Sequence, residues 1–413
     1  MDQIQNVNNN QMVQIVNEII AKRAWNTSAN TEYKKRKDWV LFTAIYSIYR
    51  SYFYRSQLVY YVMDRKDRSS IHASYQFTAT TFLIIGIITT GTLFVFTLAL
   101  NQNHTVVAQQ QLVLNGTSFQ IDNMTFSHRL ASVNGIQLHY VIGGHGNPLV
   151  LLHGWPETWY EFRLVMPALA KNYTVIVPDL RGLGDSSKPL TGYDGKTVAE
   201  DIHQLVTKLG FKTIYLAGGD VGAVIAYPYA AAHPTEVKKL VVWEAPIVGL
   251  TPSGAKPVWW FSFHQVPDLP EALVNGKEAT YLSWFYDNLA YSPAAITPAA
   301  INEYVSHYSA PGGMRAGFAY YRALPQDAIE NMNYSKTKLT MPVLALGGGY
   351  IPTFGGNITM PTVIYGMKIL AQNVQGITVP NSGHFIPEEQ PQFVTKQLTN
   401  FFAGGNTTTS TSK

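Results

Sequence analysis

LAGGDVGAVIAYPYA, residues 216–230, is the stretch of sequence that decides the fold. The apolar run at 213–217 predicts a strand, and the alanine-rich run that begins at Gly222 predicts a helix. Glycines at 218 and 222 permit a sharp strand-to-helix turn, so the residue between them, Asp220, is expected to project into a cleft. A helix N-terminus favours the ionised form of a carboxylate. The pattern therefore predicts Asp220 as a nucleophile, with a simple helix cap as the alternative.

Regular apolar runs on both sides of this turn predict further strands. Asn134-Gly135 lies between alternating apolar residues of 131–142, which predicts a hairpin. Short apolar runs then recur at 148–152, 174–178, 239–243, 342–346 and 376–380, and helical stretches at 160–170, 197–210, 222–232 and 392–402 separate them. This order predicts an α/β fold with a mostly parallel sheet that has helices on both faces.

The alternation stops at 245–337, a helical, aromatic and proline-containing insertion after the sixth predicted strand. Ligands of open α/β sheets bind beyond the carboxyl ends of the strands, so we expect this insertion to form a cap over the site. The core then comprises 128–244 and 338–403. The last residues, 404–413, have no core-forming side chains, and we expect them to be disordered.

Composition and charge indicate how the N-terminal part differs. Among 413 residues, 46% are hydrophobic, 14% are charged and none is cysteine, which argues against overall disorder and excludes disulfides, thiolate metal sites and a cysteine nucleophile. Residues 1–76 carry 11 Lys and Arg against six Asp and Glu, whereas 77–413 carry 19 against 20. The 24 residues 77–100 carry no charge and are long enough to cross about 30 Å of hydrocarbon. They predict a single transmembrane helix.

The position of the basic residues predicts the topology. They precede the apolar stretch, so the positive-inside rule predicts that 1–76 is cytoplasmic and that the rest of the chain is in the ER lumen or outside the cell, as in a single-pass type II membrane protein. Residues 101–127 are polar and are predicted to form a stalk. N-glycosylation sequons within this stalk, at Asn103, Asn115 and Asn123, agree with that topology.

Two other segments carry groups suited to acyl or alkyl transfer. His153-Gly154-Trp155-Pro156 directly follows a predicted strand, and the backbone N–H groups of Trp155 and Val221 are candidate oxyanion donors. His153 itself is expected to be structural. His384 lies between the last predicted strand and the last helix, where a general base can reach the turn at Asp220.

The segments HGWP (153–156), DLRGLGDSSKP (179–189), G-x-D-x-G and SGHF (382–385) occur in an order and with spacings that resemble the α/β-hydrolase superfamily. The likeness is to its epoxide hydrolase and haloalkane dehalogenase branch and covers about 128–403. It implies that Asp220 attacks carbon to form an alkyl-enzyme ester, and that His384 and an acid partner activate the water that hydrolyses this ester.

The acid partner departs from the commonest pattern of that branch. GGG at 347–349 offers no Asp or Glu at the end of the seventh predicted strand. Glu244 ends the sixth predicted strand instead, which resembles dehalogenases that take the acid from this position. A salt-bridged carboxylate at the rim is the alternative role for Glu244.

The leaving group separates the two chemistries of this branch. The resemblance implies that a cap tyrosine protonates an opened epoxide, and Tyr321 matches best. The earlier cap segment has no tyrosine that matches a second donor, so His264 or another tyrosine is the candidate for it. This segment also offers Trp259, Trp260, Phe263 and His264 as substrate-binding residues. The two tryptophans are equally candidates for binding a halide, whereas Val221 beside the nucleophile weakens a dehalogenase interpretation.

The resemblance implies an epoxide hydrolase, and the apolar stretch predicts that it is membrane-anchored. That location suggests small lipophilic substrates taken from the bilayer. A haloalkane dehalogenase is the first alternative, and a catalytically weak binding protein of the same fold is the second. No motif for a cofactor, a metal or nucleic acid is present, so none of these is implied. The sequence does not predict the oligomeric state.

Overall fold

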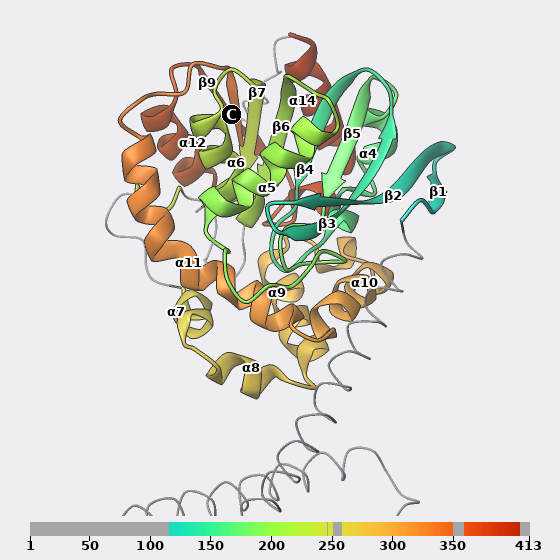
Figure 1. Ribbon diagram of the computed structural model, residues 1–413, viewed down its shortest axis with the longest axis vertical. Coiled ribbons are helices and arrows are strands. Elements are labelled where there is room, and N and C mark those ends of the chain that lie inside the picture. The colour runs from blue at the N-terminus through green and yellow to red at the C-terminus, as the bar shows by residue number, and fades with distance from the viewer. Residues whose placement is uncertain (1–114, 246, 251–257, 350–358, 405–413) are drawn as a thin grey trace, which may run out of the picture. The chain divides into compact units, whose positions relative to one another are not determined.

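The computed structural model describes residues 115–245, 247–250, 258–349 and 359–404 (Figure 1). Several predictions lie outside these residues: the basic segment 1–76, the apolar stretch 77–100, the sequon at Asn103 and nearly all of the tail 404–413. Among the helices that the structure describes, none has the length and apolar character needed to cross a membrane.

A sheet of nine strands organises the described residues, in the order β1-β2-β3-β5-β4-β6-β7-β8-β9. The first three strands and β5 pair antiparallel, and all pairs from β5 through β4 to β9 are parallel. This arrangement confirms the predicted α/β-hydrolase fold with a mostly parallel sheet. The strands are β1 Ser118–Ile121, β2 Met124–Val133, β3 Ile136–Gly144, β4 Asn147–Leu152, β5 Tyr173–Pro178, β6 Ile214–Gly219, β7 Val237–Trp243, β8 Val343–Gly348 and β9 Val374–Val379.

Strands β2 and β3 form the predicted hairpin. Val133 pairs with Ile136, and the two residues between them, Asn134 and Gly135, have φ of 41° and 78°. Positive φ at both central positions is the geometry of a two-residue type I′ turn, which Asn-Gly favours.

The prediction of a polar stalk at 101–127 is partly wrong, because the C-terminal part of this segment belongs to the sheet. Ser118–Ile121 and Met124–Val133 pair as β1 and β2 around a turn in which Asp122 and Asn123 both have positive φ. Phe126 is fully buried. Alternate apolar residues of this polar segment thus reach the core, a signal that the overall polarity of the segment conceals.

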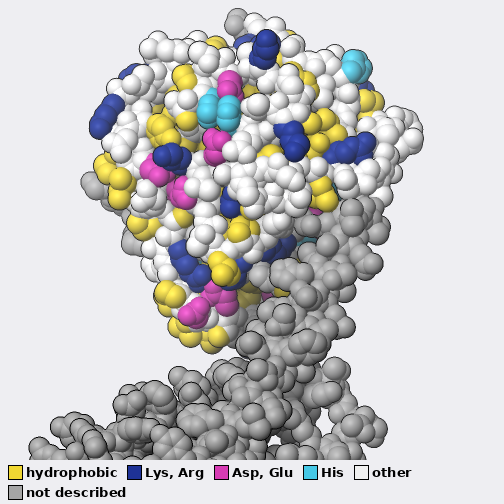
Figure 2. All heavy atoms as spheres, viewed as in Figure 1, with side chains coloured by type: hydrophobic (Ala, Val, Ile, Leu, Met, Phe, Trp, Pro, Cys, Tyr) yellow, Lys and Arg dark blue, Asp and Glu magenta, His cyan; other side chains and the backbone are white. Residues whose placement is uncertain are grey.

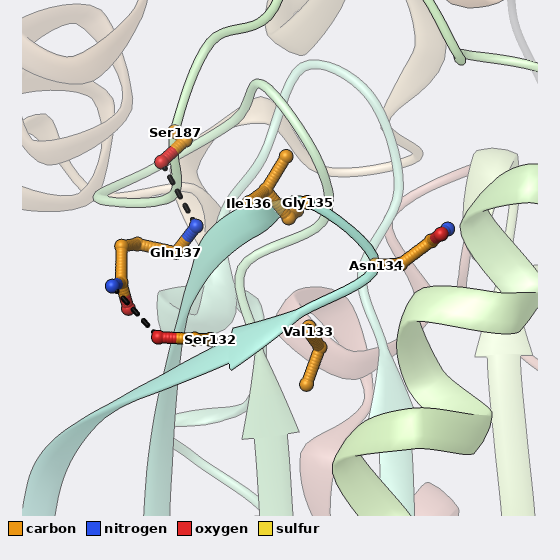
Figure 3. Close-up of a pocket in the computed structure, with 7 residues that line it drawn as sticks. All are labelled: Ser132, Val133, Asn134, Gly135, Ile136, Gln137 and Ser187. Atoms are coloured by element: carbon orange, nitrogen blue, oxygen red, sulfur yellow. Dashed lines mark hydrogen bonds between the residues drawn. The ribbon is translucent and has the colours of Figure 1, made fainter.

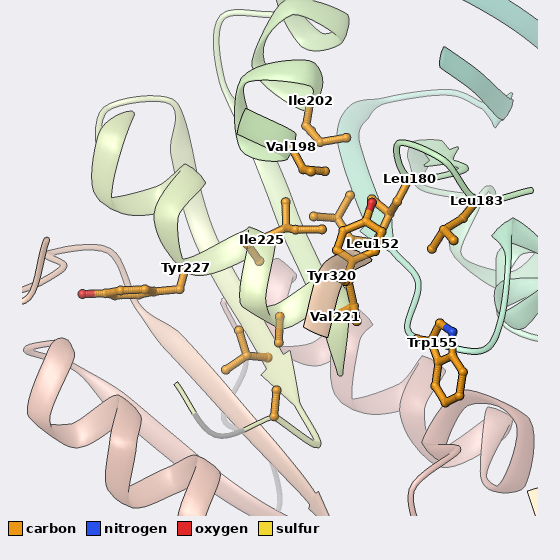
Figure 4. Packing of buried hydrophobic residues seen from close by; sticks show 14 of the residues in the cluster. Leu152, Trp155, Leu180, Leu183, Val198, Ile202, Val221, Ile225, Tyr227 and Tyr320 are labelled. Carbon is orange, nitrogen blue, oxygen red and sulfur yellow. The ribbon is translucent and has the colours of Figure 1, made fainter. Parts of the chain in front are cut away.

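Each parallel strand contributes to two cores, one on each face of the sheet. Leu149 and Leu151 of β4 belong to one hydrophobic cluster, and Val150 and Leu152 belong to the other. Helices α5 (Gly195–Lys208) and α6 (Val221–Ala232) cover the second face (Figure 4), while α14 (Pro391–Ala403) covers the first. The alternation of strand side chains explains why both faces need helices.

The helix predicted at 160–170 is two short pieces, the 3₁₀ helix η1 (Trp159–Phe162) and α4 (Met166–Leu169). Pro167 has no backbone N–H to donate and therefore favours a new helix start there. The other predicted helices correspond to α5, α6 and α14. Two helices were not predicted, α12 (Thr359–Leu370) and α13 (Ile386–Glu389).

Between β7 and β8, the described residues form five α-helices and the 3₁₀ helix η2 (Pro293–Ala295), beyond the carboxyl ends of the strands (Figure 1). Three tyrosine hydroxyls from this segment donate to backbone carbonyls in the loops after β4 and β5: Tyr286 to Pro156, Tyr308 to Glu157 and Tyr320 to Arg181. The α-helices are α7 Trp259–Gln265, α8 Leu269–Val274, α9 Glu278–Leu289, α10 Pro298–Ser309 and α11 Gly313–Tyr334.

Candidate active site

Asp220 lies at the apex of a strained turn between β6 and α6. Its φ of 50° and ψ of −122° are unusual for a residue with a side chain. The turn is closely packed, because a Cβ on Gly218 would lie 2.6 Å from the carbonyl oxygen of Gly222, and a Cβ on Gly222 would lie 2.1 Å from that of Leu152. Asp220 occupies the N-cap position of α6, but its carboxylate makes no capping hydrogen bond.

Two groups from other loops orient the Asp220 carboxylate. The backbone N–H of Trp155, in the turn after β4, donates to Oδ1 at 2.9 Å. Nε2 of His384, in the loop after β9, lies 3.4 Å from Oδ2. The Asp220 side chain is 26% exposed, so a small molecule can reach it.

Glu244 lies on the opposite side of the His384 ring. Its Oε2 is 3.4 Å from Nδ1 of His384, and its side chain is fully buried. Glu244 directly follows β7 and has a φ of 52°, a second strained position at the carboxyl edge of the sheet. The structure therefore brings Asp220, His384 and Glu244 together as carboxylate, imidazole and carboxylate.

Gly348, at the end of β8, holds Glu244 in place. Its backbone N–H donates to Oε1 of Glu244 at 2.6 Å. A Cβ on Gly348 would lie 2.1 Å from the carbonyl oxygen of Gly383, so no acidic side chain fits at this position without displacing the loop that carries His384. The sequence shows that no Asp or Glu ends this strand. It does not predict that Gly348 donates a hydrogen bond to Glu244.

The two carboxylates change the charge state of His384. Burial lowers the pKa of His384, but the contacts with Asp220 and Glu244 outweigh burial and raise the pKa from 6.5 to about 10. The imidazole is therefore protonated in the resting site at neutral pH. Because the pKa is higher in the folded chain, this contribution to stability is complete below pH 6.5 and is lost as the pH rises to about 10.

The turn after β4 is held from both sides. Gly154 lies against Asp220, because a Cβ on Gly154 would be 2.9 Å from Cβ of Asp220. Its N–H donates to Oε2 of Glu161 at 2.9 Å, and burial raises the pKa of Glu161 to about 8. Glu161 thus positions the Trp155 N–H indirectly. Sequence reasoning did not single it out, because nothing in its local pattern distinguishes it from a surface acid.

His153 and Val221 occupy the expected places around this turn. His153 is fully buried, with Nδ1 2.8 Å from the carbonyl oxygen of Gly154, and Nε2 accepts from the backbone N–H of Leu180 at 3.1 Å. Val221 is the first residue of α6, so its N–H is one of the groups that the helix itself leaves unpaired.

Tyr321 comes from α11 and lies over the turn after β4. Its ring contacts Trp155 edge-on at 5.5 Å and His264 at 4.3 Å between centroids. Burial raises the pKa of Tyr321 well above 10, and the nearby negative charge of Asp220 raises it further. A phenol beside a carboxylate in this environment keeps its proton until a stronger base approaches.

The other predicted cap residues divide into two groups. His264 is fully buried, its Nε2 lies 2.6 Å from the hydroxyl of Tyr281, and burial lowers its pKa to about 3. It is therefore neutral. Trp259, Trp260 and Phe263 instead pack against aromatic neighbours of the helical segment, and Trp259 is 49% exposed.

The predicted glycosylation sequons that the structure describes are accessible. Asn115 is exposed, and its Oδ1 accepts from the backbone N–H of Leu130 at 3.1 Å. Asn123 is exposed in the turn between β1 and β2.

Two surface hollows lie outside this arrangement. One, of about 390 Å³, lies at the β2–β3 turn, and no ionisable side chain lines it. In its lining, the backbone N–H of Gln137 donates to the Ser187 hydroxyl, and the Gln137 side chain donates to the Ser132 hydroxyl (Figure 3). The other, of about 340 Å³, lies near Pro234 and Tyr334. Neither contains Asp220, His384 or Glu244.

Comparisons with known proteins agree with the α/β-hydrolase fold. The family model described as the alpha/beta hydrolase fold matches residues 147–391. The soluble epoxide hydrolase of a Corynebacterium species is 41% identical over 287 residues, which are 67% of this chain and 97% of that protein. The fluoroacetate dehalogenase of a Burkholderia species is 30% identical, over 48% of this chain and 69% of its own length. The solved structure of the epoxide hydrolase CorEH without ligand is 38% identical, with a TM-score of 0.62 and coverage of 68% and 99%.

The charge state of His384 gives a direct test of this site. We expect Asp220→Asn and Glu244→Gln each to lower the pKa of His384 from about 10, by about 1 to 3 pH units, because each removes one neighbouring negative charge. NMR titration of the labelled imidazole in the full-length protein measures this. Asp287→Asn, at an exposed position on α9, is the matched control and should leave the pKa unchanged. An unchanged pKa in both site variants would contradict the arrangement.

Proposed function

This chain belongs to the α/β-hydrolase family, in its epoxide hydrolase branch, and is a hydrolase; on that premise we propose that it converts small lipophilic epoxides to diols. The observation that carries the proposal is the Asp220 carboxylate, which lies between the Trp155 N–H and the His384 ring. Relatives named as epoxide hydrolases support the substrate class.

In the first step, Oδ2 of Asp220 attacks an epoxide carbon and the carbon–oxygen bond of the ring breaks. The ring oxygen leaves as an alkoxide and takes the proton of the Tyr321 hydroxyl. Oδ1 becomes the carbonyl oxygen of the new ester and keeps its hydrogen bond from Trp155. A carboxylate that is already oriented needs little rearrangement to attack.

Ester formation also converts His384 into a base. The ester carries no charge, so the imidazole loses one of the two carboxylates that raise its pKa. It releases its proton, which restores the Tyr321 hydroxyl through solvent. Glu244 still orients the neutral ring through Nδ1.

In the second step, neutral His384 removes a proton from water, and the resulting hydroxide attacks Cγ of the ester. The developing negative charge on Oδ1 is stabilised by the N–H groups of Trp155 and Val221. Collapse of this intermediate releases the diol and regenerates the Asp220 carboxylate and the protonated His384. The balance is one epoxide and one water consumed for each diol formed.

A haloalkane or haloacid is the second candidate substrate. The indole Nε1 of Trp155 is buried and has no hydrogen-bond partner among the described residues, which is a donor suited to a leaving halide. The likeness to a fluoroacetate dehalogenase points the same way. A leaving halide needs no proton from Tyr321, so only the epoxide reaction requires the Tyr321 hydroxyl.

Trapping the ester tests the proposal. His384→Gln in the full-length protein should form the ester with an epoxide but hydrolyse it slowly, since no base activates the water. Intact mass should increase by the full mass of the epoxide. His384→Gln combined with Asp220→Asn should show no increase. A haloalkane in the same panel that adds its own mass less that of the halide would favour the second candidate substrate. A folded protein that gains no mass with any of these compounds would refute both candidates.

Tyr321 and its neighbour Tyr320 form a matched pair. Tyr321→Phe should slow epoxide opening by about 100-fold, because it removes the proton donor. Tyr320→Phe should leave the rate within a few-fold, since the Tyr320 hydroxyl donates to the carbonyl of Arg181. Stopped-flow measurement of ester formation compares them. Equal rates of ester formation in the two variants would show that the Tyr321 hydroxyl is not the proton donor.

We further propose that residues 77–100 anchor the chain in a membrane with the hydrolase fold on the lumenal or extracellular side. The uncharged stretch, the preceding basic residues and the sequons at Asn103, Asn115 and Asn123 support this. In eukaryotic cells, the full-length chain should resist extraction by alkaline carbonate, and glycosidase should shift its mass. Release by carbonate would contradict the anchor, and the absence of a shift would contradict the topology.

A further inference from the structure

Two histidines and a glutamate meet at the end of α6 that is farthest from Asp220. His203 lies on α5, His233 is the C-cap of α6 and Glu236 precedes β7. One potential ligand atom from each lies within 4.8 Å of the others. Figure 2 shows histidine side chains between acidic ones on the face that α5 and α6 cover. We propose that His203, His233 and Glu236 bind a divalent transition-metal ion, with Zn²⁺ best suited to this donor set.

The carboxylate of Glu236 already bridges the two rings. Its Oε2 lies 3.1 Å from Nδ1 of His203, and its Oε1 lies 3.7 Å from Nδ1 of His233. Zinc bonds of about 2.0–2.2 Å place tetrahedral ligand atoms roughly 3.5 Å apart, so these separations are close to those required. The two rings are stacked with centroids 3.9 Å apart, so one ring must turn to direct its nitrogen at the ion. All three side chains are about a quarter exposed, which permits that turn and gives the ion access.

The surroundings of the cluster favour a cation. The hydroxyl of Tyr229, a buried residue, donates to Oε2 of Glu236 at 2.8 Å, and such outer hydrogen bonds orient carboxylate ligands. Glu200 lies one turn before His203 on α5 and adds a carboxylate to that helix. The C-terminal end of α6 adds partial negative charge.

The proposed site is separate from the hydrolase chemistry. Helix α6 has 12 residues, which place His233 roughly 18 Å from Asp220. A bound ion would join α5, α6 and the start of β7, so its effect would be on stability and not on turnover. Sequence patterns do not predict this site, because His203 and His233 are 30 positions apart and match no short metal-binding motif.

Zinc stoichiometry tests the proposal. The tag-free full-length protein is stripped with EDTA and dialysed against ZnCl₂, and bound zinc is measured by elemental analysis. The wild type should bind one equivalent more than His233→Ala, and zinc should raise the unfolding temperature of the wild type but not of the variant. His145→Ala, which alters an exposed histidine between β3 and β4, is the matched control and should bind as the wild type does.

Further variants separate loss of binding from loss of folding. Tyr229→Phe removes no ligand and should weaken binding about 10-fold at unchanged stoichiometry. His203→Gln and Glu236→Gln should each lose the extra equivalent while keeping the wild-type circular dichroism in EDTA. Wild-type affinity and stoichiometry in these folded variants, or no bound zinc in the wild type, would overturn the proposal.

Discussion

The strained backbone at Asp220 is the constraint on which the rest of the site depends. Asp220 keeps its φ of 50° only because the surrounding glycines let β4, β6 and α6 come into contact. That turn holds one carboxylate oxygen at the Trp155 N–H and the other beside the His384 ring. A relaxed turn would return Asp220 to an ordinary capping role and leave the oxyanion donor without a partner. The packing of the parallel sheet therefore maintains the geometry of Asp220, the proposed nucleophile.

The two carboxylates beside His384 determine the charge of its ring. An imidazole between two carboxylates is held as a cation in the resting state. In the mechanism that we propose, ester formation neutralises one carboxylate and lowers the pKa of His384, so the same residue then acts as a base. Gly348 approaches the His384 loop too closely to carry a side chain, and its N–H donates to Glu244 at the end of β7. The packing of these two loops is therefore consistent with our proposal that Glu244 is the acid partner of His384.

Local patterns were predictable from the sequence, and long-range contacts were not. The Asn134-Gly135 turn and the strand, turn and helix around Asp220 depend on neighbouring residues, so their patterns predict them well. The pairing of β1 with β2 was missed because a polar segment hides its alternate apolar side chains. The hydrogen bond from Gly348 to Glu244 spans 104 positions, and the contact of Glu161 with Gly154 depends on how the turn folds back. Such contacts leave no periodic signal in the chain.

A single turnover in ¹⁸O-labelled water tests the central claim most directly, because an ester on Asp220 requires that the first oxygen added to the substrate come from the protein. With enzyme in excess over an epoxide, the diol should carry unlabelled oxygen, and one labelled oxygen should appear in the peptide that contains Asp220. A diol that carries the label after one turnover, with no label in that peptide, would show direct attack by water and would contradict the role of Asp220 as nucleophile.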